Sequence, residues 1–154
     1  MRLLILSDAE AIDLFKGLEL LTNAAKVTLS SINVDESRHE ITIPMKRRSF
    51  ERKRFLLFGE RYKLLSSDLI DSNLIIRNVL NHKITDNLHL TDILILFGVS
   101  IKNKEIILCS AEDQSGETAF VMSIKVQTYD IELLDENKQI YQSALPNQAL
   151  KLTE

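Results

Sequence analysis

Short apolar and alternating runs in the second half of the chain constrain the fold most. Residues 93–97 (ILILF) form a continuous apolar run, as expected for a strand covered on both faces. Residues 105–109 (EIILC) predict a second strand, and apolar side chains at every second position over 120–126 predict a third. We therefore expect an antiparallel meander over residues 93–134.

The alternation changes phase near the end of that meander. Tyr129, Ile131 and Leu133 occupy odd positions, whereas the apolar residues of 120–126 occupy even ones. A one-residue slip within a long strand is what a β-bulge produces, so the pattern predicts a bulge near Thr128.

The N-terminus indicates a strand followed by a helix. Residues 3–6 are apolar, and Ser7 with Glu10 matches a capping box. Apolar residues then recur at spacings of three and four, which predicts an amphipathic helix ending near Thr22–Asn23. Gly17 weakens that helix by about 1 kcal/mol relative to alanine.

Between these two parts the pattern is less decisive. Residues 26–45 alternate with a period of two around a polar turn and predict a hairpin. Pro44 cannot donate to a ladder, so we place it at a strand end or on an edge. Residues 64–90 fit a helix and a strand equally well.

The fold class that follows is α+β and β-rich, with the N-terminal strand and helix packed on antiparallel strands in a sandwich or open barrel. The length of 154 residues fits one domain. We expect residues 1–136 to form that globular domain and the polar residues 137–154 to form a loosely attached tail.

The distribution of charge is the main functional feature. Residues 46–63 (KRRSFERKRFLLFGERYK) contain eight Lys or Arg and two Glu, a net charge of +6. The chain as a whole carries −3, so the remainder carries −9, the difference between −3 and +6. The segment also contains four of the nine aromatic residues. Such segregation indicates contact with phosphate, with an acidic partner, or with an acidic part of the same fold.

Neither a helix nor an extended strand gathers these charges on one face. The aromatic residues can belong to the core as readily as they can stack on the bases of a nucleic acid. The basic residues can also be the solvated faces of edge strands, where they prevent aggregation. An internal partner is available in the acidic residues 130–136. For an external partner, the candidate contact residues are Lys46, Arg47, Arg48, Arg52, Lys53, Arg54 and Arg61.

Several kinds of site are excluded or disfavoured by composition. Cys109 is the only cysteine, so neither an internal disulfide nor a cysteine-rich zinc site can form. The four glycines lie far apart, which excludes a phosphate-binding glycine loop. No apolar run is long enough for a secretory signal or a membrane span. We therefore expect a soluble cytoplasmic protein with no cofactor and no membrane contact.

A second cluster combines His82, Asp86, His89 and Asp92 within eleven residues. Imidazole and carboxylate groups suit zinc, manganese or iron, and on one helix the first three would share a face. The spacing matches no established ligand motif, and exposed loop residues explain it more simply, so we assign no metal site.

These observations favour a non-enzymatic binding or assembly module whose contact lies in the basic segment 46–63. A protein partner or self-association is the preferred form, because strands 93–97 and 105–109 need covering. Binding of nucleic acid or a phosphorylated ligand through the same segment is the first alternative. An enzyme of unrecognised type that uses His82, Asp86 and His89 is the second.

Overall fold

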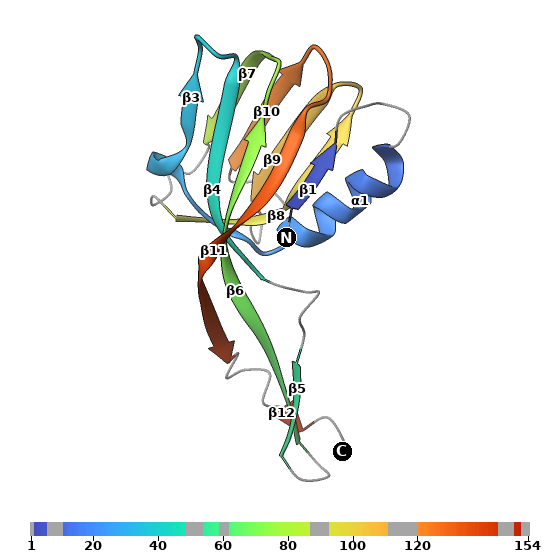
Figure 1. Ribbon diagram of the computed structural model, residues 1–154, viewed down its shortest axis with the longest axis vertical. Helices are drawn as coiled ribbons and strands as arrows, with labels where there is room; N and C mark the ends of the chain where they lie inside the picture. The colour runs from blue at the N-terminus through green and yellow to red at the C-terminus, as the bar shows by residue number, and fades with distance from the viewer. Residues whose placement is uncertain are drawn as a thin grey trace.

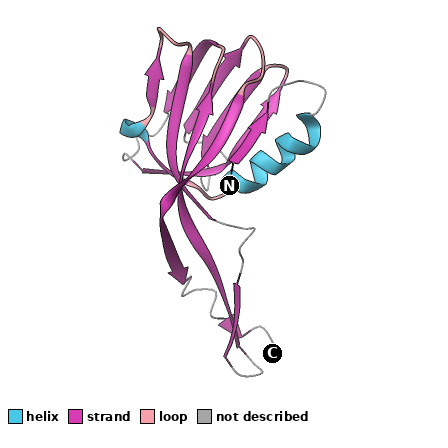
Figure 2. Ribbon diagram, in the orientation of Figure 1, coloured by secondary structure: helices cyan, strands magenta, loops and turns pink. Residues whose placement is uncertain are grey.

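The computed structural model describes residues 2–5, 11–48, 54–58, 62–86, 93–110, 120–144 and 150–151. Strands dominate this part of the chain, with the helix α1 (Ala11–Thr22) and the short 3-10 helix η2 (Leu29–Ser31) beside them (Figures 1 and 2). The strands are β1 (Arg2–Ile5), β2 (Lys26–Thr28), β3 (Asn33–Asp35), β4 (Glu40–Arg48), β5 (Arg54–Phe58), β6 (Tyr62–Ile76), β7 (Val79–Asp86), β8 (Ile93–Lys102), β9 (Glu105–Ser110), β10 (Phe120–Val126), β11 (Ile131–Ala144) and β12 (Leu150–Lys151).

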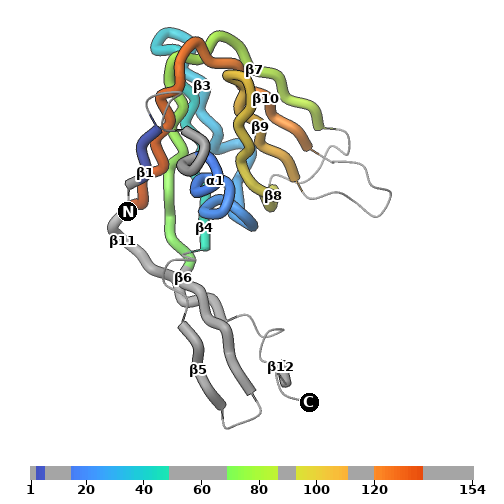
Figure 3. The backbone as a smooth tube through the Cα atoms, turned by 90° about the vertical axis from the view of Figure 1, so that its right-hand side faces the viewer, coloured from blue at the N-terminus to red at the C-terminus, as the bar shows by residue number. Residues whose placement is uncertain are grey.

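The strands form one open antiparallel sheet in the order β1-β11-β6-β4-β2-β8-β9-β10-β7. β3 pairs with β4, while β5 and β12 pair with β6. The sheet folds back on itself, so that β1, β11, β6 and β4 form one layer and β8, β9, β10 and β7 the other (Figure 3). The β-rich α+β fold is therefore confirmed, and within the described strands the sheet does not close into a barrel.

Alternation along each strand builds the core between the layers. In β4 and β10 every second side chain is buried, as a sheet covered on one face requires, and β8 follows the same pattern up to Gly98. Leu18 of α1 joins this core, and the ring of Phe15 meets Tyr129 edge to face at 5.1 Å between centroids. The helix lies between the two layers and packs mainly on β8 (Figure 3).

The predicted long strand with a bulge near Thr128 is not present, although the pairing of β10 with β7 has a register shift between Lys125 and Val126. β10 ends at Val126 and β11 begins at Ile131, and the two strands belong to different layers. The phase of the alternation changes there because the chain crosses from one layer to the other. The meander itself is present as β8, β9 and β10.

The region predicted as a hairpin contains two short pairings. β3 pairs with the start of β4, and β2 pairs with Met45 and Lys46 further along it, with η2 between them. Pro44 lies inside β4 and not at a strand end, as one of the two expected positions required. It stands in the part of β4 that pairs with neither β2 nor β3. It therefore needs no amide hydrogen on that side, as on an edge.

Residues 64–90 fitted a helix and a strand equally well in the sequence. Where the structure describes them, they form the strands β6 and β7, which are joined at residues 77–78. β11 passes the expected domain boundary at residue 136 and pairs with β6 as far as Ala144. The Ser7–Glu10 capping box lies outside the described residues.

Candidate functional site

The basic segment begins at the end of β4, where alternation separates neighbouring charges. Arg47 is buried, whereas Lys46 is exposed on the outer face and Arg48 is half-buried. Arg54 begins β5, and only its backbone is described. Arg52, Lys53 and Arg61 lie outside the described residues. Within the described part, the candidate contact residues thus do not share one surface.

Arg47 forms a buried ion pair with Asp135 of β11. Its Nε donates to Oδ1 of Asp135 at 2.9 Å and its Nη2 to Oδ2 at 2.6 Å. The two side chains are 0% and 5% exposed. Ser72 of β6 donates a third hydrogen bond to Oδ1 of Asp135 at 2.7 Å. The group therefore joins β4, β6 and β11, three consecutive strands of one layer.

The electrostatics of this pair favour the ionised state. Burial by itself raises the pKa of the Asp135 carboxyl group, but the hydrogen bonds from Arg47 and Ser72 and the charge of Arg47 outweigh it, so the pKa lies below its ordinary value. For Arg47, the internal acidic partner suggested by residues 130–136 is present. A guanidinium that is fully buried on a carboxylate offers nothing to an external ligand.

Lys46 points the other way, into a hollow of about 460 Å³ on the outer surface of β2, β4 and β6. Strand register places Lys46 between Lys26 of β2 and Asp71 of β6. The remaining lining is polar or apolar without further basic groups. The lining residues are Lys26, Thr28, Ser31, Pro44, Met45, Lys46, Asp71, Ser72, Asn73, Ile93 and Glu136.

An apolar row adjoins this hollow on β8. Ile93, Ile95 and Phe97 point outward and are 63%, 53% and 62% exposed. Ile95 is paired with Lys26 and Ile93 with Thr28, so the row continues directly into the lysine-containing surface. We call the surface formed by Ile93, Ile95, Phe97, Lys26 and Lys46 the β8–β2–β4 face.

Sequence alone does not bring these residues together. Lys26, Lys46 and Ile95 are separated by twenty to seventy residues, and only the register of β2 between β4 and β8 makes them neighbours. The continuous apolar run 93–97 suggested burial on both faces, but the outer face of β8 is uncovered. The absence of polar residues at positions 93, 95 and 97 was the available signal.

The second predicted cluster is not assembled in the described region. His82 and Asp86 lie on β7, an extended strand rather than a helix, and His89 and Asp92 are outside the described residues. No group of three metal-ligating side chains gathers among the residues that the structure describes. Cys109 is half-buried on β9.

Comparison with known proteins adds no identity. No protein-family model, curated protein or solved structure matches the chain. In the described residues, no helix has the length and apolar character needed to cross a membrane. We therefore infer the function of the protein from its own surface.

Proposed function

We propose that this protein is a non-enzymatic binding or assembly module that holds a partner protein on the β8–β2–β4 face. The observation that carries the proposal is the row of three large apolar side chains exposed side by side on β8. Contiguous exposed apolar side chains, bordered by polar ones, mark interaction surfaces, whereas scattered single ones do not.

The apolar row supplies the driving force of such a contact. Burial of one large aliphatic or aromatic side chain contributes about 1.5–3 kcal/mol when it is complete. Ile93, Ile95 and Phe97 each retain more than half of their exposure. They stand on one face of a strand held by β2 and β9, so they present a fixed pattern to a partner.

The charges beside the row supply specificity. The hollow contains Lys26 and Lys46 together with the carboxylates of Asp71 and Glu136, so neither sign dominates. A nucleic-acid surface needs an excess of cations over its whole contact area. This mixed lining favours a protein partner that carries charged groups of both signs around an apolar centre.

The proposal is tested with Ile95→Ser and Lys46→Glu in a capture assay with the protein that copurifies with the wild type. Each change is expected to lower capture at least about tenfold, because truncated central contacts of an interface cost roughly 1–4 kcal/mol. Arg47 is unsuitable as a test position, since its replacement leaves Asp135 buried without its cation.

The matched controls are Leu20→Ser and Lys16→Glu on α1, which change an exposed apolar and an exposed basic side chain away from this face. They are expected to retain capture, and circular dichroism is expected to show that all four variants fold. Undiminished capture by both Ile95→Ser and Lys46→Glu would place the contact elsewhere.

A further inference from the structure

A second candidate binding surface, besides the β8–β2–β4 face, lies between β3 and β7, where the folded sheet does not close. In the described part of the chain, β7 pairs only with β10, and β3 pairs only with β4. Residues of both strands line one cleft, and the chain segments approach each other at one end, where the Val79 amide donates to the His39 carbonyl at 2.9 Å. We call the region between these two strands the β3–β7 seam.

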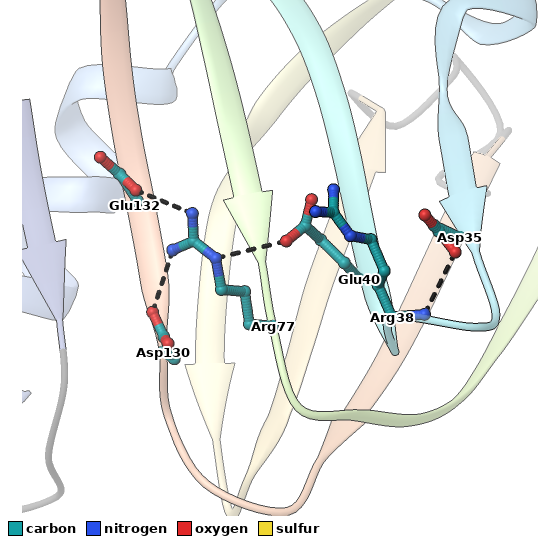
Figure 4. Close-up of polar contacts among 6 residues, drawn as sticks. All are labelled: Asp35, Arg38, Glu40, Arg77, Asp130 and Glu132. Atoms are coloured by element: carbon teal, nitrogen blue, oxygen red, sulfur yellow. Dashed lines mark hydrogen bonds and ion pairs between the residues drawn. The ribbon is translucent and has the colours of Figure 1, made fainter.

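The closed end of the seam is held by Arg77, just after the end of β6 (Figure 4). Its guanidinium reaches Glu40 of β4 at 3.3 Å, Asp130 at 3.2 Å and Glu132 of β11 at 3.1 Å. These contacts tie the start of β4, the strand that pairs with β3, to the start of β11, and Arg77 stands two residues before the first residue of β7. The position of the seam is therefore set by the fold itself.

The seam contains a cleft of about 480 Å³. Ile41 and Val79 are buried at its base, and Leu80 is exposed at its rim. Among the described residues, the lining includes three carboxylates and two histidines but no Lys or Arg. The lining residues are Val34, Asp35, Glu36, His39, Glu40, Ile41, Val79, Leu80, Asn81 and His82.

Burial along the rows of the sheet falls sharply at β7 and β3. Register aligns Val99, Leu108, Met122 and Ile84 in one row across β8, β9, β10 and β7. The first three are 0%, 2% and 0% exposed, whereas Ile84 is 48% exposed. In the other layer, Val34 of β3 is only half-buried at the end of a buried row. The core thus stays uncovered at both edges of the seam.

We propose that the β3–β7 seam accepts an extended peptide of a partner protein by strand addition to β7, with apolar side chains at alternate positions and Lys or Arg between them. The edge of β7 supplies backbone hydrogen bonds, as in other strand-addition complexes. Alternate apolar side chains cover Ile84 and Val34, because successive side chains of a strand point to opposite faces.

We expect Lys or Arg in the bound peptide because the lining of the cleft is acidic. Asp35 accepts hydrogen bonds from the Ser37 hydroxyl and the Arg38 amide, which lower the pKa of its carboxyl group and keep it ionised. Glu36 is exposed at the same edge, and no Lys or Arg of the described part of the chain lines the cleft. This site is separate from the β8–β2–β4 face, so either can exist without the other.

The test uses the synthetic octapeptide acetyl-Thr-Lys-Val-Lys-Val-Arg-Val-Thr-amide and the full chain, followed by amide hydrogen exchange. The peptide is expected to slow exchange in residues 79–86 and 33–35 at least about tenfold, since ladder formation protects amides in proportion to the occupancy of the bound state. The same peptide with prolines at its first two valines is expected to lose this effect, because proline cannot donate to the ladder.

Two variants on β7 distinguish seam binding from simple charge attraction. Ile84→Gln, on the inward side, is expected to weaken binding about tenfold. Lys83→Gln, on the outward side of the same strand, is expected to change it less than about twofold. The proposal is overturned if the peptide protects neither strand, if both variants bind like the wild type, or if β7 becomes protected by a second copy of the chain without peptide.

Discussion

Lys46 and Arg47 are adjacent residues of β4 with opposite environments. The pleat directs Lys46 to the solvent-filled hollow and Arg47 to Asp135 in the interior. A buried carboxylate or guanidinium is costly unless it is paired and hydrogen-bonded, and here Ser72 completes the carboxylate's partners. Within the described part of the basic segment, Arg47 therefore has an internal role, whereas the neighbouring Lys46 lies on an exposed surface.

Asp135→Asn tests the internal role through its dependence on pH. Asp135 has a lowered pKa in the folded protein, so it stabilises the fold above about pH 4, the pKa of an unfolded aspartate, and this contribution disappears as pH falls through the folded pKa. We expect the variant to lose about 3–5 kcal/mol at pH 7. Its deficit relative to the wild type should shrink below pH 4.

Urea unfolding of both proteins between pH 3 and pH 7 measures this difference. Asp71→Asn is the matched control, because Asp71 is a half-buried aspartate on the outer face of the same layer. A deficit for Asp135→Asn that stays constant over this range contradicts the ionised pair.

At the level of the element, β8 combines two features that neighbouring strands lack. Its outward side chains are apolar and exposed, and it contains a register shift between Leu96 and Gly98. Gly98 has a φ of 147°, and a Cβ at this position would lie 3.2 Å from Cγ of Glu19 on α1. The absence of a side chain at Gly98 therefore lets α1 pack on the strand.

Gly98→Ala and Gly17→Ala form a matched pair that tests this packing. We expect Gly98→Ala to destabilise the protein by about 1–3 kcal/mol, because it combines a strained φ with a close contact. Gly17 lies inside α1, where a Cβ would meet no atom within 4 Å, so Gly17→Ala is expected to stabilise by about 0.5–1 kcal/mol. Denaturant unfolding at pH 7 measures both, and effects of equal sign contradict the proposed role of Gly98.

At the scale of the molecule, local patterns predicted most elements but not their partners. Short apolar runs predicted β8 and β9, and period-two alternation predicted β10, which buries one face. The crossing between β10 and β11 was mistaken for a bulge, since a change of layer and an extra residue shift the alternation identically. The pairing of Arg47 with Asp135, 88 residues away, depends on strand order, which no local pattern contains.

The same limit applies to the candidate site. The sequence drew attention to residues 46–63, and Lys46 does lie at a hollow, but Lys26 and Ile95 join it through register alone. The described part of the fold thus leaves two uncovered regions, an outer apolar face on β8 and an unfilled seam between β3 and β7. We assign the binding function to the first of these.

Hydroxyl-radical footprinting, with and without the captured partner, tests this assignment most directly. We expect the labelling of Ile93, Ile95 and Phe97 to fall at least about threefold on binding, because an interface excludes water from its central side chains. Leu20 and Leu80 have similar exposure, 60% and 63%, on other surfaces and should label unchanged. Unchanged labelling of the β8 row, with protection at Leu20 or Leu80 instead, would contradict the assignment of the β8–β2–β4 face.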